Sequence, residues 1–532
     1  MLNTKLKLTL GLAVLAAATA LAQTQTNAPA GATSAPPTGA PAAIPVAATP
    51  APPPPTAFDN WANEVKNPVG WFSWGGDMRV RNEYFDNAVS LTPNAQQSPI
   101  FAQVHEQDYF RFRGRLWASI FPTNDLTFNV RLAAEPREFM KPSTMDTYLY
   151  QSGMQWRYGI IDTLNVQWKK PLDLPATLTV GRQDVFLGDG WLVGDCTPED
   201  GSFTSFLDSA RITWDLKEQH TTIDAIALVQ YARPDAWLPT IGPSTAQGAN
   251  PEPLLLTDQN EKGFILWVAN KTRPAANLDA FFLYKHDTRI NDYPEASFGD
   301  NADIYTIGGQ ISGLLEDHWK YSVEGAYQFG RKADPELVVT PSGGLISSSQ
   351  AMNTYHDIVA YGLNSKLTYL LKDPLNNQFS LSFELLSGDN PKTGNDEMFD
   401  VLWGRWPRWS ELYVYGFIAE SRPGQIGNLI RLGPTWNVNP IKAMDFSLSY
   451  YALFADVDTP TRPLNQAFGL PAADTPFSNN GNFRGHYLQS ILKYKFTKHL
   501  SGLLMGEVLF PGDYYASRNV MDFVRAEVMY TF

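Results

Sequence analysis

Arginine recurs at every second position in two stretches near the beginning of the chain. Arg79 and Arg81 follow this spacing, and so do Arg111, Arg113 and Arg115. A guanidinium group stays charged in proteins, and its planar fork binds a carboxylate through two parallel hydrogen bonds. A row of such groups could therefore bind carboxylated solutes and pass them along.

A structural role for the same arginines is the alternative. Arginines and glutamates on one wall, such as Arg79 and Glu83, can pair and stabilise that wall without touching a solute. The first role suits a channel that selects anions, and the second suits a wide channel without marked substrate choice.

The residues between the arginines indicate which elements position them. Met78 and Val80 flank Arg79, and Phe110 and Phe112 flank Arg111. This period-two alternation predicts strands with one apolar and one charged face. An arginine that faces lipid near the middle of a membrane costs about 2–4 kcal/mol, so the apolar face should point outward and the arginines inward. The candidate pore-lining and substrate-binding residues from this pattern are Arg79, Arg81, Arg111, Arg113, Arg115, Arg131, Arg211, Arg431 and Arg525.

The end of the chain, residues 521–532, alternates in the same way. Val524, Val528 and Phe532 share an apolar face, whereas Arg525 and Glu527 lie on the other face. A strand of a soluble sandwich could carry this pattern, but an apolar edge strand invites aggregation. The last strand of a closed membrane barrel pairs with the first and leaves no edge. We therefore expect a closed barrel.

Alternating segments recur from residue 72 to the end, and the connectors between them are short and long in turn. Bacterial outer-membrane barrels have an even number of strands, short periplasmic turns and long outer loops. The sequence thus predicts an all-β fold, a transmembrane antiparallel β-barrel of about 18 strands with these two kinds of connector. A further alternating segment, 411–420, would make the count odd, so we assign 403–420 to an outer loop that could fold inward. A propeller would need a repeat of roughly forty residues, which the sequence lacks. The expected strands are 72–85, 108–121, 125–134, 160–169, 176–184, 208–216, 220–231, 261–272, 276–287, 302–314, 318–330, 355–371, 376–388, 427–439, 443–455, 484–497, 499–511 and 521–532.

The N-terminal part divides into three segments before the barrel. Residues 1–22 read as a secretory signal peptide, with lysines, an apolar stretch and a small-residue cleavage site. Residues 23–57 form a Pro/Ala-rich disordered linker, which is a passive spacer or a periplasmic tether. Residues 58–70 are a periplasmic lead-in, and 71–532 form the transmembrane β-barrel. We expect this protein in the cell outer membrane.

The overall composition excludes two classes of protein. Aromatic residues make up 13% of the chain and the mean hydropathy is −0.25, a mixture that fits one-sided strands and not a helical membrane protein. The net charge of −13 argues against nucleic-acid binding. The expected partners are outer-membrane lipid, anionic polysaccharide or small anions, and periplasmic export or cell-wall components.

Several short motifs resemble the alginate-export family of outer-membrane barrels. They are Thr179-Val180-Gly181-Arg182-Gln183, then Gly188 and Gly190, Phe206-Leu207-Asp208 with Arg211, and the segment from Gly404 to Tyr413. The resemblance covers most of residues 70–532 and implies an eighteen-strand barrel whose electropositive constriction passes an anionic uronate polymer. It adds Arg182 as a pore candidate. By simple alternation Arg182 shares a face with Val180, so a bulge or a place at the membrane rim would have to explain it. The alginate exporter has a long periplasmic plug loop, whereas every periplasmic turn expected here is short.

Other chemistry-bearing residues point to no reaction. The chain has no HExxH or Gly-x-Ser-x-Gly pattern, so we expect no enzyme, no cofactor and no metal. Loop aspartates could hold calcium, but their spacing matches no known loop and favours a solvated surface. Three tryptophans at every third position could stack on sugar rings or pack within a loop. The single cysteine, Cys196, can form no internal disulfide. The aspartates are Asp184, Asp189, Asp195 and Asp200, and the tryptophans are Trp403, Trp406 and Trp409.

These observations leave three functional hypotheses. The first is an outer-membrane channel whose arginine-rich lumen passes anionic, carboxylated oligo- or polysaccharides. The second is a general or nutrient-uptake porin without marked substrate choice. The third is a surface enzyme or adhesin built on the barrel.

Overall fold

The structure is a computed structural model of the 532-residue chain. The residues it describes are 56–87, 106–141, 159–194, 206–233, 236–242, 256–257, 259–293, 296–298, 300–333, 337–339, 345–347, 355–390, 392–404, 407–415, 426–458, 477–478 and 480–532. The expected signal peptide, nearly all of the expected linker, Cys196, Asp195, Asp200 and Trp406 lie outside these residues.

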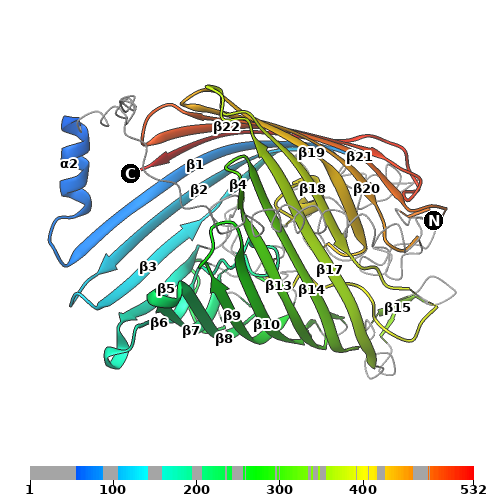
Figure 1. The fold of residues 1–532 in the computed structure, drawn as a ribbon, viewed down its shortest axis with the longest axis horizontal. Helices are drawn as coiled ribbons and strands as arrows, with labels where there is room; N and C mark the ends of the chain where they lie inside the picture. Colours follow the sequence, from blue (N-terminus) through cyan, green and yellow to red (C-terminus); the bar gives the residue numbers. More distant parts are fainter. Residues whose placement is uncertain are drawn as a thin grey trace, which may run out of the picture.

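One antiparallel sheet closes on itself to form a barrel (Figure 1). The first strand, β1 (Phe72–Asp86), pairs with the last, β23 (Met521–Thr531), so that Val80 lies opposite Val528. The sheet contains nineteen segments, but β3 and β4 are two pieces of one wall position beside β2, which leaves eighteen strands around the barrel. The strands between β1 and β23 are β2 (Glu106–Ile120), β3 (Leu126–Ala134), β4 (Arg137–Lys141), β5 (Ile160–Lys169), β6 (Ala176–Gln183), β7 (Leu207–Leu216), β8 (Thr221–Gln230), β9 (Asn260–Asn270), β10 (Asn277–Thr288), β13 (Ala302–Leu315), β14 (Trp319–Ala333), β17 (Tyr355–Leu370), β18 (Gln378–Leu386), β19 (Leu429–Ile441), β20 (Met444–Phe454), β21 (Phe483–Lys495) and β22 (Leu500–Pro511).

The predicted fold is confirmed, and most strand ends fall within three residues of the expected ones. The exception is the third strand, which continues as β4 after a break at Pro136. Proline has no backbone N–H to donate to the ladder, yet its carbonyl still accepts a hydrogen bond from the Phe112 N–H at 3.0 Å. Two small hairpins extend the long loops, β11 (Ile290–Tyr293) with β12 (Ala296–Phe298) and β15 (Leu337–Val339) with β16 (Leu345–Ser347). Two 3₁₀ turns, η1 (Pro171–Asp173) and η2 (Lys217–Gln219), lie in short connectors.

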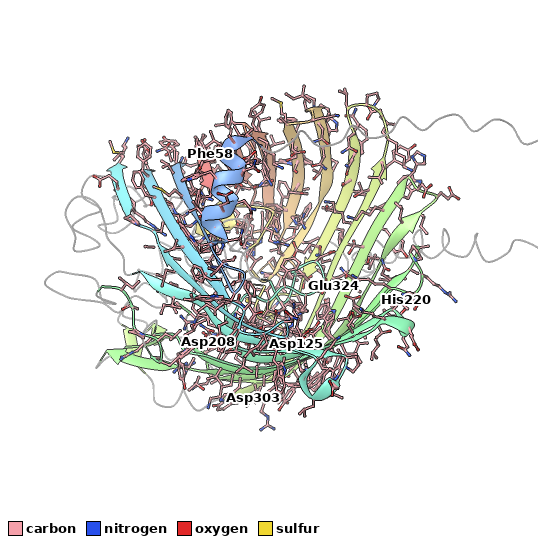
Figure 2. All side chains as sticks on the ribbon, turned by 90° about the vertical axis from the view of Figure 1, so that its left-hand side faces the viewer. Phe58, Asp125, Asp208, His220, Asp303 and Glu324 are labelled. Atoms are coloured by element: carbon pink, nitrogen blue, oxygen red, sulfur yellow. The ribbon has the colours of Figure 1, made fainter. Side chains whose placement is uncertain are left out.

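The two faces of the wall differ as the alternation requires. On β1, Met78 is 68% exposed and Val80 is 43% exposed, whereas Arg79 and Arg81 between them are at most 2% exposed. The apolar face is therefore the outer, lipid-facing one. Most of the buried polar side chains point into the barrel, where other side chains and inward-folded segments cover them (Figure 2).

Two segments from the long-loop end fold into the barrel and fill part of it. The first spans 185–194, and the second spans 396–404 and 407–415 with the short helix α5 (Leu412–Tyr415). They meet where Val193 pairs with Trp403 in a parallel bridge. Their apolar side chains, including Leu192 and Leu412 with no exposed surface, belong to the main hydrophobic cluster. The described part of 403–420 is thus no barrel strand, and it folds inward.

A helix that the sequence did not predict precedes the barrel. Helix α2 (Ala57–Lys66) lies at the short-turn end, near the C-terminus and across the direction of the strands (Figure 1). Thr56 and Asp59 form a reciprocal capping box at its start. Among the described residues, no helix is both long and apolar enough to cross a membrane.

Candidate solute-binding wall of the lumen

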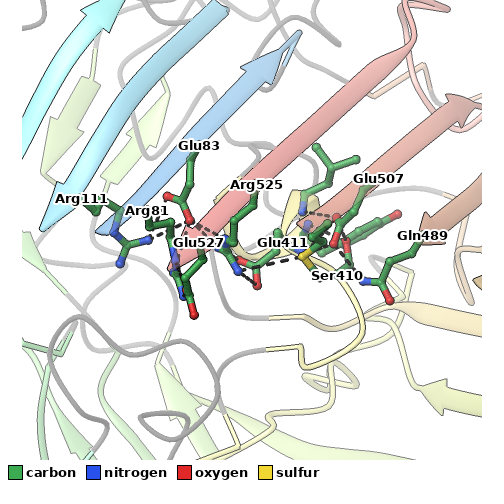
Figure 3. A network of polar contacts seen from close by, with 12 residues as sticks. Arg81, Glu83, Arg111, Ser410, Glu411, Gln489, Glu507, Arg525 and Glu527 are labelled. Carbon is green, nitrogen blue, oxygen red and sulfur yellow. Dashed lines mark hydrogen bonds and ion pairs between the residues drawn. The ribbon is translucent and has the colours of Figure 1, made fainter. Parts of the chain in front are cut away.

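A buried network of ion pairs joins the first strands to the last one (Figure 3). At its centre, the Glu83 carboxylate accepts hydrogen bonds from Arg111 at 3.0 Å, from Arg81 at 3.3 Å and from Arg525 at 2.8 Å. Glu83 has no exposed surface. A buried carboxylate is stable as an anion only when such partners compensate for its lost hydration.

The pairs in this network join residues of several strands. Arg79 contacts Glu135 at 2.8 Å, and Glu83 contacts Arg81, Arg111 and Arg525. Glu135 also accepts from Arg111 at 2.8 Å, and Arg81 donates to Glu527 at 2.7 Å. Partners therefore come from neighbouring strands and from the break between β3 and β4.

The inward segment 407–414 is fixed to this network by two glutamates. Glu411 accepts two hydrogen bonds from Arg525, both of 2.8 Å. Glu507 on β22 accepts from the backbone N–H groups of Glu411 and Leu412 at 3.0 Å. Its carboxylate also accepts from the Gln489 amide at 2.9 Å. Carboxylate contacts of this kind hold the segment against the wall (Figure 3).

A cavity of about 510 Å³ lies in the wall beside this network, across β2, β3, β5, β6 and β7. We call it the arginine pocket, because Arg115, Arg131 and Arg211 line it. The other lining residues are Trp117, Ala118, Ser119, Asn129, Val130, Thr163, Asn165, Gln167, Thr179, Gln183 and Asp184. The pocket therefore combines three cations with amide and hydroxyl groups that could bind a sugar.

Each arginine of the arginine pocket is paired, but the carboxylate lies deeper in the wall. The exposed fractions of guanidinium and carboxylate side chains are 14% and 3% for Arg115 with Asp77, 16% and 0% for Arg131 with Asp162, and 23% and 7% for Arg211 with Asp224. Asp184 is the exception, because it is 37% exposed and also pairs with Arg131. Apart from Asp184, the pocket thus presents the cations of these pairs to the lumen.

Trp117 gives the arginine pocket an aromatic surface. It is partly exposed and lies on the same face of β2 as Arg115. A Cβ atom on Gly75 would come within 2.9 Å of the Trp117 ring, so glycine at this position leaves room for the indole. Sequence reasoning missed Trp117, although its spacing of two from Arg115 could have revealed it.

A larger cavity of about 1030 Å³ lies between the inward segments and the wall from β10 to β21. Arg431 lines it and donates to Glu384 at 3.0 Å, and its guanidinium lies 5.1 Å from the ring centre of Trp409. Hydroxyl groups on neighbouring strands bond to one another here, such as Thr368 with Ser380 at 2.9 Å. Lys320, Lys366 and Arg408 also line this cavity, together with Asp189 and Glu384, so it holds charged groups among its many neutral ones.

Arg182 does not line either cavity. Its cross-strand neighbours are Leu164 and Asp208, and Leu164 is exposed on the outer face together with Val180. Its guanidinium donates to Asp208 at 2.7 Å and lies 3.9 Å from the ring centre of Phe206. Arg182 thus shares a face of β6 with Val180, and its side chain is buried against Asp208 and Phe206.

The tryptophans and aspartates considered above contact other residues of the protein. Trp403 is buried and donates its indole N–H to Glu261 at 3.1 Å. Trp409 packs against Tyr413 and Tyr487, with ring centres 5.0 and 5.4 Å apart. Asp189 accepts a hydrogen bond from Ser322 at 2.6 Å. In the described part of the chain, no group of three or more potential metal ligands comes together.

The comparison with protein families decides the identity of the barrel. The family model for alginate export matches residues 71–526, which is most of the chain. The chain belongs to the alginate export family. It is an outer-membrane β-barrel channel, and its family consists of transport proteins.

Solved structures of other barrels are similar over most of their length. OccAB3 of Acinetobacter baumannii has 12% sequence identity and a TM-score of 0.49, and the match covers 86% of this chain and 99% of that one. OccK2 (OpdF) of Pseudomonas aeruginosa in complex with glucuronate has 11% identity and a TM-score of 0.47, over 86% and 98% of the two chains. The comparison with curated proteins found no match.

Proposed function

We propose that this member of the alginate export family passes anionic, carboxylated oligo- or polysaccharides across the outer membrane. The observation that carries the proposal is the arginine pocket, in which Arg115, Arg131 and Arg211 are more exposed than Asp77, Asp162 and Asp224 behind them. A solute in the lumen therefore meets the guanidinium groups first. The electrostatic barrier for an anion falls, although the chain as a whole carries a net charge of −13.

The arginine pocket can act as one of several successive binding sites along which a carboxylated solute moves. Two unit charges 4 Å apart attract by about 4 kcal/mol when the effective dielectric constant is about 20. The aspartates behind the arginines reduce this attraction, so that each carboxylate binds weakly and is released again. Conduction requires such weak, successive sites. Trp117 offers a flat apolar face for a sugar ring, and Gln167 and Thr179 line the same pocket with polar groups for its hydroxyls.

A general or nutrient-uptake porin is the alternative, and one observation favours it. The buried network arginines, such as Arg81 and Arg111, each contact carboxylates at 3.0 Å or less. Balanced pairs of this kind produce little net field in the lumen. If they dominate, the channel discriminates weakly between anions and cations.

Block of the conductance by oligouronates tests the proposal in planar bilayers. Micromolar to millimolar oligouronate should reduce the current through the wild type. Replacing Arg115, Arg131 and Arg211 by glutamine should weaken this block. Arg331→Gln is the matched control, because Arg331 is 73% exposed and pairs with the equally exposed Asp357 on the outward side of β14. No block of the wild type, or equal block of the wild type and the triple variant, would favour the unselective porin.

A further inference from the structure

Helix α2 has one apolar face although it lies outside the barrel. Phe58, Trp61, Ala62 and Val65 follow the i, i+3, i+4, i+7 spacing of an amphipathic helix. Ten residues span about 15 Å, which is far too short to cross a membrane. The helix therefore needs a surface along which its apolar face can lie.

Part of that face packs on the outer side of the barrel seam. The Trp61 ring lies 6.2 Å from the ring of Phe532, and the Trp74 indole N–H donates to the Val65 carbonyl at 2.7 Å. Trp74 belongs to the same face of β1 as Met78, and Phe532 pairs with Gly76 on that face. Because Met78 is on the lipid-facing side, α2 adjoins the lipid-facing wall.

Charged groups hold the helix at this place. Asp59, in the first turn of α2, pairs with Lys498 and lies 3.4 Å from His499, both in the turn before β22. The Phe58 ring meets His499 edge-on at 5.7 Å. The position of α2 at the short-turn rim is thus fixed by the barrel and is visible from the barrel end (Figure 2).

The rest of the apolar face remains uncovered by the described residues. Phe58 is 46% exposed and Trp61 is 52% exposed, whereas Ala62 is buried. Trp71, at the start of the barrel, is exposed in the same region. These aromatic side chains continue the apolar outer wall, which the membrane covers, to its short-turn edge.

We propose that α2 is an interfacial helix, with Phe58 and Trp61 inserted into the phospholipid surface of the periplasmic leaflet. Aromatic residues are favoured at this depth of a bilayer, and amphipathic helices lie in its plane. The orientation of α2 across the strands matches this plane, because barrel strands run through the membrane. The helix fastens the start of the barrel to the leaflet.

Site-specific quenching in phospholipid nanodiscs tests this inference on the full chain. With Cys196→Ser as background, Trp61→Cys and Asn60→Cys each provide one site for a bimane label. Asn60 is the matched control, because it is exposed and about 100° away from Trp61 around the helix. Lipids with a nitroxide near the headgroup should quench the label at 61, and aqueous iodide should quench the label at 60.

Protection of position 61 from both quenchers would mean that protein covers it, and this result would overturn the proposal. Strong iodide quenching at both positions would also overturn it. Because the label replaces Trp61, a second measurement keeps that ring: Phe58→Ser should raise the rate of tryptic cleavage after Lys66 in nanodiscs. Asn63→Ser, on the polar side, should leave that rate unchanged, and equal rates for the two variants would contradict the insertion of Phe58.

Discussion

Glu411 and Arg525 join the inward segment to the strand that closes the barrel. Two hydrogen bonds of 2.8 Å connect their carboxylate and guanidinium groups, and Arg525 also donates to Glu83. The strand that completes the wall thus also positions the segment that narrows the lumen. A carboxylated solute that reached Arg525 would have to compete with Glu411 for the guanidinium group.

Glu411→Gln should release part of the inward segment and raise the single-channel conductance, because a neutral amide cannot form the two-point ion pair. Breaking a buried ion pair costs about 3–5 kcal/mol, and the remaining Glu83 contact should keep the loss below that range. Conductance in planar bilayers and urea unfolding measure the two effects. Glu218→Gln, in the exposed turn η2, is the control. An unchanged conductance with current noise like that of the wild type would show that Glu411 does not hold the segment.

Glu507→Leu should loosen the same segment by leaving backbone donors without an acceptor. Each buried donor that loses its partner costs about 1–3 kcal/mol. Glu411 and Glu507 hold one segment, so their effects on the free energy of unfolding should be non-additive in a double-mutant cycle. Strict additivity would indicate two independent contacts.

Trp117→Ala should weaken block by oligouronate by about 2- to 10-fold, if stacking on the indole contributes about 0.5–1.5 kcal/mol. Conductance of small ions should change little, because the charges of the arginine pocket remain. Titration of the current with oligouronate measures the first effect and an ion-current trace the second. Trp117→Phe should retain most of the affinity, and a loss as large as that of Trp117→Ala would argue against stacking.

The contribution of Asp59 to the docking of α2 should be lost only in acid. The ion pair with Lys498 and the hydrogen bond from the Thr56 N–H lower the pKa of Asp59 below its ordinary value. A group with a lowered pKa stabilises the docked state above its unfolded pKa of about 3.9 and loses this effect as the pH falls through the folded value. Bimane at position 61 should therefore report the same environment from neutral pH to about pH 5. Asp59→Asn should weaken docking throughout this range, and a transition near neutral pH would contradict the assignment to Asp59.

The barrel could be predicted from the sequence because lipid imposes one apolar face on every strand. The alternation of apolar and charged residues is already visible in Met78, Arg79 and Val80. The pairing of Arg79 with Glu135 could not be predicted, since it depends on the break at Pro136. The contact of Glu411 with Arg525 could not be predicted either, because the alternation of 411–420 does not indicate which residue of the wall the loop meets.

Helix α2 was missed for a related reason. It is only ten residues long and follows a Pro-rich stretch whose composition indicates disorder. Its apolar spacing becomes meaningful only beside Trp74 and Phe532.

The reversal potential under a salt gradient tests the central claim most directly. The reversal potential of the wild-type channel should have the sign expected for an anion-selective channel. Replacing Arg115, Arg131 and Arg211 by glutamine should move the reversal potential toward zero, whereas Arg331→Gln should leave it unchanged. A cation-selective wild type, or a triple variant that reverses at the wild-type potential, would contradict the account.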